Sequence, residues 1–162
     1  MYARASKKKR CVLRVVTLIC TKFAAEKNIT YMLERDYIMR LIREFAEALE
    51  LLLDKKDRDI QRQEMRNMYN QYVGPYEFYH TAAISDVMDS FTQFAEDERI
   101  SRMEMLADLY YAEADMLCGP SRDMLLEKAL ALFSFIDRHS RTYSMERMAK
   151  IGSIRQRIAS KA

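Results

Sequence analysis

The sequence predicts an all-α protein built from antiparallel helical hairpins, with about five to six helices. The first observation is compositional: the 162 residues include 3 Gly and 2 Pro, whereas Ala, Leu, Met, Glu, Lys and Arg are abundant. Good helix formers with few helix breakers favour helices joined by short turns. The second observation is that apolar side chains recur three and four positions apart over long stretches, which is the spacing of one helix face.

The chain changes its charge near Tyr31. Residues 1–31 carry eight basic side chains and one acidic side chain, net +7, whereas residues 32–162 carry 19 basic and 23 acidic side chains, net −4. Such asymmetry indicates a boundary. We therefore expect a basic leader at residues 1–31 and a single helical domain at residues 32–162. Three interpretations of the leader are open: sequence upstream of a true start at Met32, a targeting or membrane-surface segment, or a helix packed on the domain.

The cysteines divide in the same way, with Cys11 and Cys20 in the leader and Cys118 alone in the domain. A single thiol forms no internal disulfide, which suits a reducing compartment. No run of 18 or more apolar residues occurs, so we expect no ordinary membrane-spanning helix. These observations predict a soluble, cytoplasmic protein.

The first predicted hairpin joins a helix at residues 33–53 to a second, weaker apolar stripe at residues 60–73. A charged turn at residues 54–59 connects them. The second stripe ends at Gly74 and Pro75, where Gly can terminate a helix and Pro cannot continue one. Residues 76–83 are ambiguous between a short helix and an irregular link.

The second half of the domain contains four further apolar stripes, each typical of a helix. They span residues 87–95, 98–118, 124–138 and 144–158. Serines precede three of them and are expected to cap their first turns, because a hydroxyl can accept a hydrogen bond from an unpaired amide two or three residues on. These are Ser85, Ser121 and Ser144. The helix at residues 124–138 is the most apolar, so we expect it to be the most buried.

Two segments carry a resemblance to a known family: MLERDYIMRLIREFAEALELLLDKK at residues 32–56 and EKALALFSFIDRHSRTYSMERMAKIGSIRQRI at residues 127–158. In these segments the chain resembles an uncharacterised bacterial all-helical family, a domain of unknown function. The resemblance implies a start at Met32 and a tetratricopeptide-like array in the C-terminal half, and it implies no catalytic residue or ligand. Ala129 and Phe133 fit part of the tetratricopeptide pattern, but no 34-residue repeat is visible.

Few residues suggest catalysis or metal binding. Glu77 and His80 have the Glu-x-x-His spacing of di-iron helical bundles, but a di-iron site needs a second copy and two further glutamates. We expect His80 to be a turn or interface residue instead. Cys118 has no histidine nearby in the sequence and is expected to be at least half-buried. We therefore predict no cofactor, no metal and no enzymatic activity.

Four tyrosines gather around Gly74 and Pro75 and are candidates for an aromatic contact patch: Tyr69, Tyr72, Tyr76 and Tyr79. A tyrosine ring can pack against apolar groups while its hydroxyl stays in water, which suits an interface. The hypothesis requires that Tyr72 and Tyr76 are not both fully buried. The twelve methionines are mostly on predicted apolar faces, where they fill the core, although a methionine-rich groove for a partner helix is the alternative.

The last predicted helix carries a candidate basic face formed by Arg147, Lys150, Arg155 and Arg157. Cations near a helix C-terminus interact favourably with the helix dipole, which explains part of this pattern without a ligand. The leading hypothesis is a non-enzymatic module that binds a protein or peptide or forms a homo-oligomer. The alternative is a nucleic-acid-associated protein that uses the leader and the basic face, which the net charge of the domain disfavours.

Overall fold

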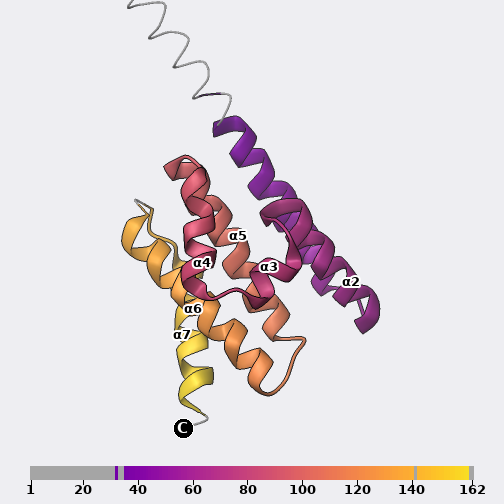
Figure 1. The fold of residues 1–162 in the computed structure, drawn as a ribbon. Coiled ribbons are helices and arrows are strands. Elements are labelled where there is room, and N and C mark those ends of the chain that lie inside the picture. The colour runs from indigo at the N-terminus through magenta and orange to yellow at the C-terminus, as the bar shows by residue number, and fades with distance from the viewer. Residues whose placement is uncertain (1–31, 33–34, 141, 161–162) are drawn as a thin grey trace, which may run out of the picture. The chain divides into compact units, whose positions relative to one another are not determined.

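The computed structural model describes residues 32, 35–140 and 142–160 and confirms the all-α prediction, since these residues contain no strand (Figure 1). The chain divides into two compact units, residues 1–40 and 41–162. Residues 35–40 of the first unit are helical. The predictions for the leader at residues 1–31 lie outside the described residues.

Helical backbone at residues 41–53 opens the second unit. The helices that follow are α2 (Arg58–Met68), α3 (Tyr76–Thr81), α4 (Ile84–Ser90), α5 (Glu96–Ala114), α6 (Pro120–His139) and α7 (Met145–Ala159) (Figure 1). A π-helical turn, Tyr69–Val73, extends α2, and a 3₁₀ turn, Phe91–Gln93, extends α4. The ambiguous segment at residues 76–83 therefore contains a short helix, and the predicted second stripe is α2 with its π-helical extension.

The bend after the π-helical turn depends on Gly74. Its φ of 153° lies in a region that L side chains rarely adopt. A Cβ at this position would lie 2.8 Å from the Tyr79 ring, closer than carbon atoms pack. The missing side chain thus lets α3 turn back toward the helix that precedes it, and Asn70 supports the turn by accepting a hydrogen bond from the Tyr76 amide.

One of the three predicted serine caps is confirmed. The Ser144 hydroxyl accepts a hydrogen bond from the Arg147 amide at the start of α7. The Ser121 prediction is wrong because α6 begins earlier, at Pro120, whose ring suits the first helical position since no amide hydrogen is needed there. The Ser85 prediction is also wrong: α4 begins at Ile84, with Ala83 in the capping position.

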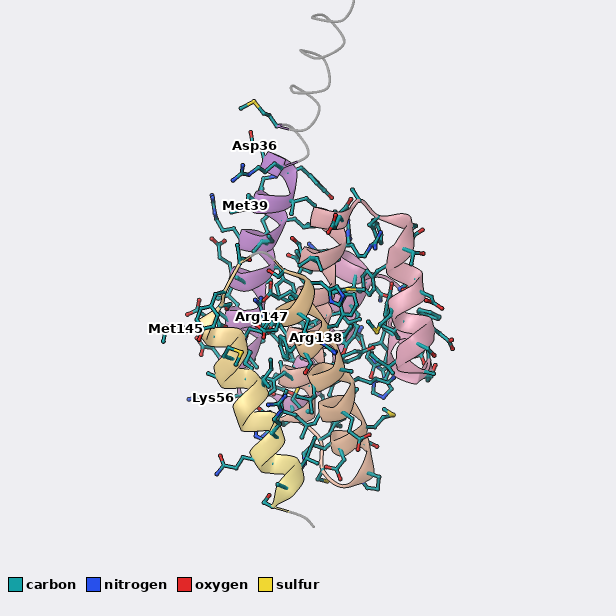
Figure 2. The ribbon with its side chains drawn as sticks, turned by 90° about the vertical axis from the view of Figure 1, so that its left-hand side faces the viewer. Asp36, Met39, Lys56, Arg138, Met145 and Arg147 are labelled. Atoms are coloured by element: carbon teal, nitrogen blue, oxygen red, sulfur yellow. The ribbon has the colours of Figure 1, made fainter. Side chains whose placement is uncertain are left out.

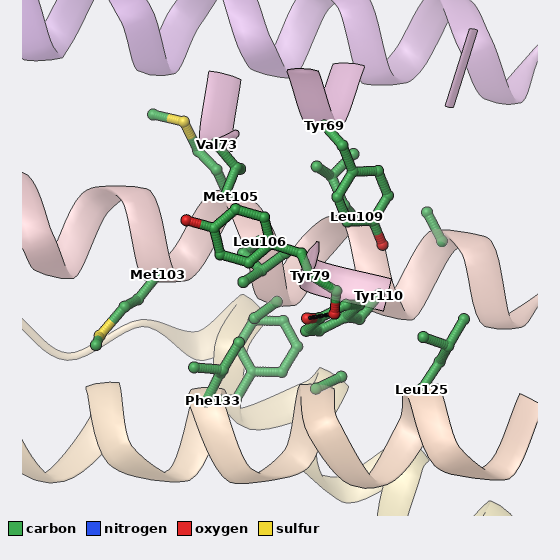
Figure 3. Packing of buried hydrophobic residues seen from close by; sticks show 14 of the residues in the cluster. Tyr69, Val73, Tyr79, Met103, Met105, Leu106, Leu109, Tyr110, Leu125 and Phe133 are labelled. Atoms are coloured by element: carbon green, nitrogen blue, oxygen red, sulfur yellow. Dashed lines mark hydrogen bonds between the residues drawn. The ribbon is translucent and has the colours of Figure 1, made fainter. Parts of the chain in front are cut away.

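The core lies where α5 packs against α6. Figure 3 shows Leu106, Leu109 and Tyr110 of α5 beside Leu125 and Phe133 of α6. All five side chains are at most 1% exposed. The helix predicted to be most buried contributes seven buried residues to the core, namely Leu125, Leu126, Lys128, Ala129, Leu132, Phe133 and Ile136.

α5 and α7 run in the same direction, and α6, which connects them in the sequence, runs in the opposite direction. Side-chain pairs show this, because Glu104 contacts Arg147 and Tyr111 contacts Ser153, so residue numbers rise together along both helices. α6 packs against each of the two. Consecutive helices in alternating directions agree with hairpin packing, and the tetratricopeptide-like array stays a prediction.

Candidate functional site

Of the four tyrosines predicted to form a contact patch, Tyr69 and Tyr76 contact each other, with ring centroids 5.1 Å apart, and three of the four are buried. Tyr69, Tyr72 and Tyr79 are 0%, 4% and 4% exposed, and Tyr76 is half-buried. The prediction of an aromatic surface patch is therefore wrong for these three. The physical reason is that these rings pack against other side chains of the core: the Tyr72 ring centroid lies 5.3 Å from that of Phe45, and the Tyr79 ring centroid lies 5.8 Å from that of Phe91. The Tyr69 ring, for example, lies 6.0 Å from the ring of Tyr110 in α5.

A buried carboxylate in α5 binds two of these four tyrosines. Glu113 is 7% exposed and accepts hydrogen bonds from the hydroxyls of Tyr69 (2.7 Å) and Tyr76 (2.8 Å). Burial raises the pKa of both phenols, and the negative charge of Glu113 raises each pKa further. The phenols therefore stay protonated over the physiological pH range. Hydrogen bonds to an ionised acceptor are stronger than those between neutral groups, so this cluster holds α3 and the π-helical turn against α5.

Lys128 of α6 provides the positive charge beside this carboxylate. Its ammonium donates hydrogen bonds to the carbonyls of Tyr79 (3.3 Å) and His80 (2.7 Å), which lie in the last turn of α3. A cation at the C-terminal end of a helix satisfies carbonyls that have no partner within the helix. Burial lowers the pKa of Lys128, and Glu113 opposes that effect. Tyr110 donates a further hydrogen bond to the Tyr79 carbonyl.

His80 is a packed residue of this cluster. Its ring stacks on Tyr76 with centroids 5.0 Å apart, and its Nδ1 lies 3.5 Å from a Glu113 oxygen. These contacts join α3, α5 and α6 through a set of polar side chains: Glu113, Lys128, His80, Tyr69, Tyr76 and Tyr110. We call these residues the Glu113 cluster. The Glu113 carboxylate already accepts two hydrogen bonds from within the fold, so its role is to stabilise the packing of these helices.

The other residues considered for chemistry are not gathered around His80. Glu77 is exposed. Cys118 is also exposed, which contradicts the expectation of burial, because it lies beyond the end of α5 in the turn before α6. Within residues 32, 35–140 and 142–160, no group of three or more His, Cys, Asp or Glu side chains could hold a metal ion.

The basic residues of α7 do not form an open face. Arg147 is 3% exposed, whereas a basic surface face requires its side chain to be exposed. Its guanidinium donates to Glu104 of α5 (2.8 Å) and to the Thr142 carbonyl (2.7 Å), and its Nε lies 3.6 Å from Asp137 of α6. Figure 2 views this part of the molecule, with Met145 and Arg147 labelled in the first turn of α7.

Two more of the predicted basic residues are paired with carboxylates, one in α5 and one on the residue that follows it. Lys150 donates to Asp108 (2.7 Å), and Arg157 donates to Asp115 (2.5 Å), whereas Arg155 is exposed. Burial raises the pKa of Asp108 to about 6, and Lys150 only partly offsets this effect. The basic face is therefore mostly a ladder of ion pairs between two helices. The nucleic-acid hypothesis loses the open cationic helix on which it partly relied.

The sequence interpretation missed a second apolar row on the helix at residues 41–53. Ile42, Ala46, Leu49 and Leu53 follow one another at intervals of four, three and four residues, the heptad spacing of a seam that packs against another helix. Leu53 is 50% exposed, Ala46 is exposed, and Ile42 and Leu49 are half-buried. We call these four residues the heptad row.

The heptad row lies beside the core-facing side of its helix. Phe45 and Leu52 face the core, with 4% and 1% exposure. At 3.6 residues per turn, the heptad row is rotated by roughly 80° from them. The sequence signal was present but overlapped with the stronger core-facing stripe, since Ile42 and Leu49 belong to both. Arg43 and Glu50 are exposed, lie seven residues apart, and flank the heptad row on the side away from Phe45 and Leu52.

No helix in the described part of the chain is long and apolar enough to cross a membrane. Comparison of the chain with family models, curated proteins and solved structures found no match. The resemblance to an uncharacterised bacterial helical family therefore stays a prediction.

Proposed function

We propose that this protein is a non-enzymatic helical module that acts by self-association. The observation that supports the proposal is the heptad row, which presents Ala46 and Leu53 to water beside the half-buried Ile42 and Leu49. Apolar side chains at heptad spacing release free energy when a second helix removes them from water. A second copy of the chain carries the same row, so two copies can cover each other's apolar surface through one symmetric contact.

The polar clusters favour the same proposal. Arg147 and Lys150 bind carboxylates of α5, and Arg157 binds Asp115, which follows α5. Glu113 binds the hydroxyls of Tyr69 and Tyr76. These groups hold helices together and are already engaged within the fold. Binding of a partner therefore releases most free energy where it covers apolar side chains, as in the heptad row.

Sedimentation velocity on the full chain over a range of concentrations tests the proposal. The Leu53→Gln variant should weaken association, because two copies each lose a partly exposed leucine from the contact. A loss of about 1 kcal/mol per copy raises the dissociation constant roughly 30-fold. Leu51→Gln is the matched control, since Leu51 is 67% exposed and lies on the opposite side of the same helix. A chain that stays monomeric at about 100 μM, or a dimer that is weakened only by Leu51→Gln, would contradict the proposal.

A further inference from the structure

The residues that flank the heptad row carry information on the orientation of the partner. Arg43 and Glu50 are exposed, are seven residues apart, and therefore lie at the same heptad position on the solvent side of the row. On the other side of the row lie Phe45 and Leu52, which are buried in the core of their own chain. The charged flank is thus the one that a partner helix can reach.

We infer that the heptad row packs against the same row of a second copy with the two helices antiparallel. This inference rests on the proposed self-association and specifies its geometry. In an antiparallel pair related by a two-fold axis, the charged flanks of both copies lie on one side of the seam. Arg43 of each copy then faces Glu50 of the other, which forms two equivalent ion pairs. In a parallel pair, the same flank would face the partner's Phe45 and Leu52 positions, and no such ion pair could form.

The sizes of the side chains in the row support the same orientation. In an antiparallel seam centred between Ala46 and Leu49, Ala46 of one copy lies opposite Leu49 of the other, and Ile42 lies opposite Leu53. The small Ala46 side chain leaves room for the larger leucine, which is how facing positions interdigitate. A parallel seam in register would instead place Ala46 against Ala46 and leave a gap between the two helices.

Charge reversal tests the orientation separately from self-association. Arg43→Glu or Glu50→Arg alone places like charges opposite each other at two symmetric sites, so each variant should raise the dissociation constant roughly tenfold at low salt. The double variant Arg43→Glu with Glu50→Arg restores both pairs and should bind within about twofold of the original chain. All three variants should keep the unfolding midpoint of the monomer, because both residues are exposed.

A distance measurement tests the orientation of the two helices independently. Cys11, Cys20 and Cys118 are replaced by serine in the full chain, and a spin label is attached at Asp54→Cys, just beyond the helix. In the antiparallel pair, the two labels are separated along the seam by about 20 Å, whereas in a parallel pair they lie about 10 Å apart across it. A dimer that has close labels, or that the double charge swap fails to restore, overturns the antiparallel inference and leaves self-association standing. A chain that is monomeric throughout overturns both.

Discussion

Replacing Glu113 with alanine should destabilise the fold by about 3–5 kcal/mol. The carboxylate accepts hydrogen bonds from Tyr69 and Tyr76, and a hydrogen bond to a charged acceptor contributes about 1.5–3 kcal/mol. Tyr69 is 0% exposed, so its hydroxyl cannot regain water and loses the larger share, about 2–3 kcal/mol. Tyr76 is half-buried and can be partly rehydrated, so it loses about 1–2 kcal/mol. The total is a large part of the stability of a typical domain.

Urea unfolding followed by circular dichroism measures this change. Glu127→Ala is the matched control, because Glu127 is an exposed glutamate of α6 and its loss should change the free energy of unfolding by less than about 0.5 kcal/mol. Tyr69→Phe in the original chain and in the Glu113→Ala background completes a double-mutant cycle. The reasoning is refuted if Glu113→Ala costs less than about 1 kcal/mol, or if Tyr69→Phe costs the same in both backgrounds.

Three further substitutions test the attachment of α7. Arg147→Ala should cost about 2–4 kcal/mol in urea unfolding, because it removes a buried cation and leaves Glu104 without its partner. Burial raises the pKa of Asp108 to about 6 in the folded chain, from 3.8 in the unfolded chain. Between these two values the folded chain binds a proton at Asp108 that the unfolded chain has lost. The free energy of unfolding therefore falls as the pH rises from 4 to 6. Asp108→Asn should remove this fall, at most about 3 kcal/mol, when unfolding is compared at pH 4 and pH 7. Ser144→Ala should cost about 1 kcal/mol through the lost cap, and no change in the unfolding midpoint would contradict this expectation.

Helix positions could be predicted from the sequence because they depend on local spacing. The stripe at residues 98–118 corresponds to α5, Glu96–Ala114, and the stripe at residues 144–158 corresponds to α7, Met145–Ala159. The start of α6 is harder to predict, because a proline in a sequence usually indicates the end of a helix. At Pro120 it is instead the first helical residue, where its fixed φ is favourable.

The environments of polar residues could not be predicted in the same way, because they depend on partners far along the chain. Arg147 and Glu104 are 43 residues apart, and Tyr69 and Glu113 are 44 residues apart. The sequence shows that α7 carries cations, but only the packing of α7 alongside α5 shows that Glu104, with Asp108 further along, lies opposite them. Helical periodicity describes one helix at a time, and it carries no information on which helix lies next to it.

The same distinction explains why the heptad row is a better indicator of function than the charged residues. A buried cation such as Arg147 must be paired inside the fold, as it is with Glu104, since an unpaired charge in the core is strongly destabilising. The exposed members of the heptad row, Ala46 and Leu53, have no such requirement, and their helix is already anchored in the core by Phe45 and Leu52. Replacing Ala46 and Leu53 with polar residues should therefore leave the fold intact while abolishing self-association. That separation of stability from association is what the proposed function requires.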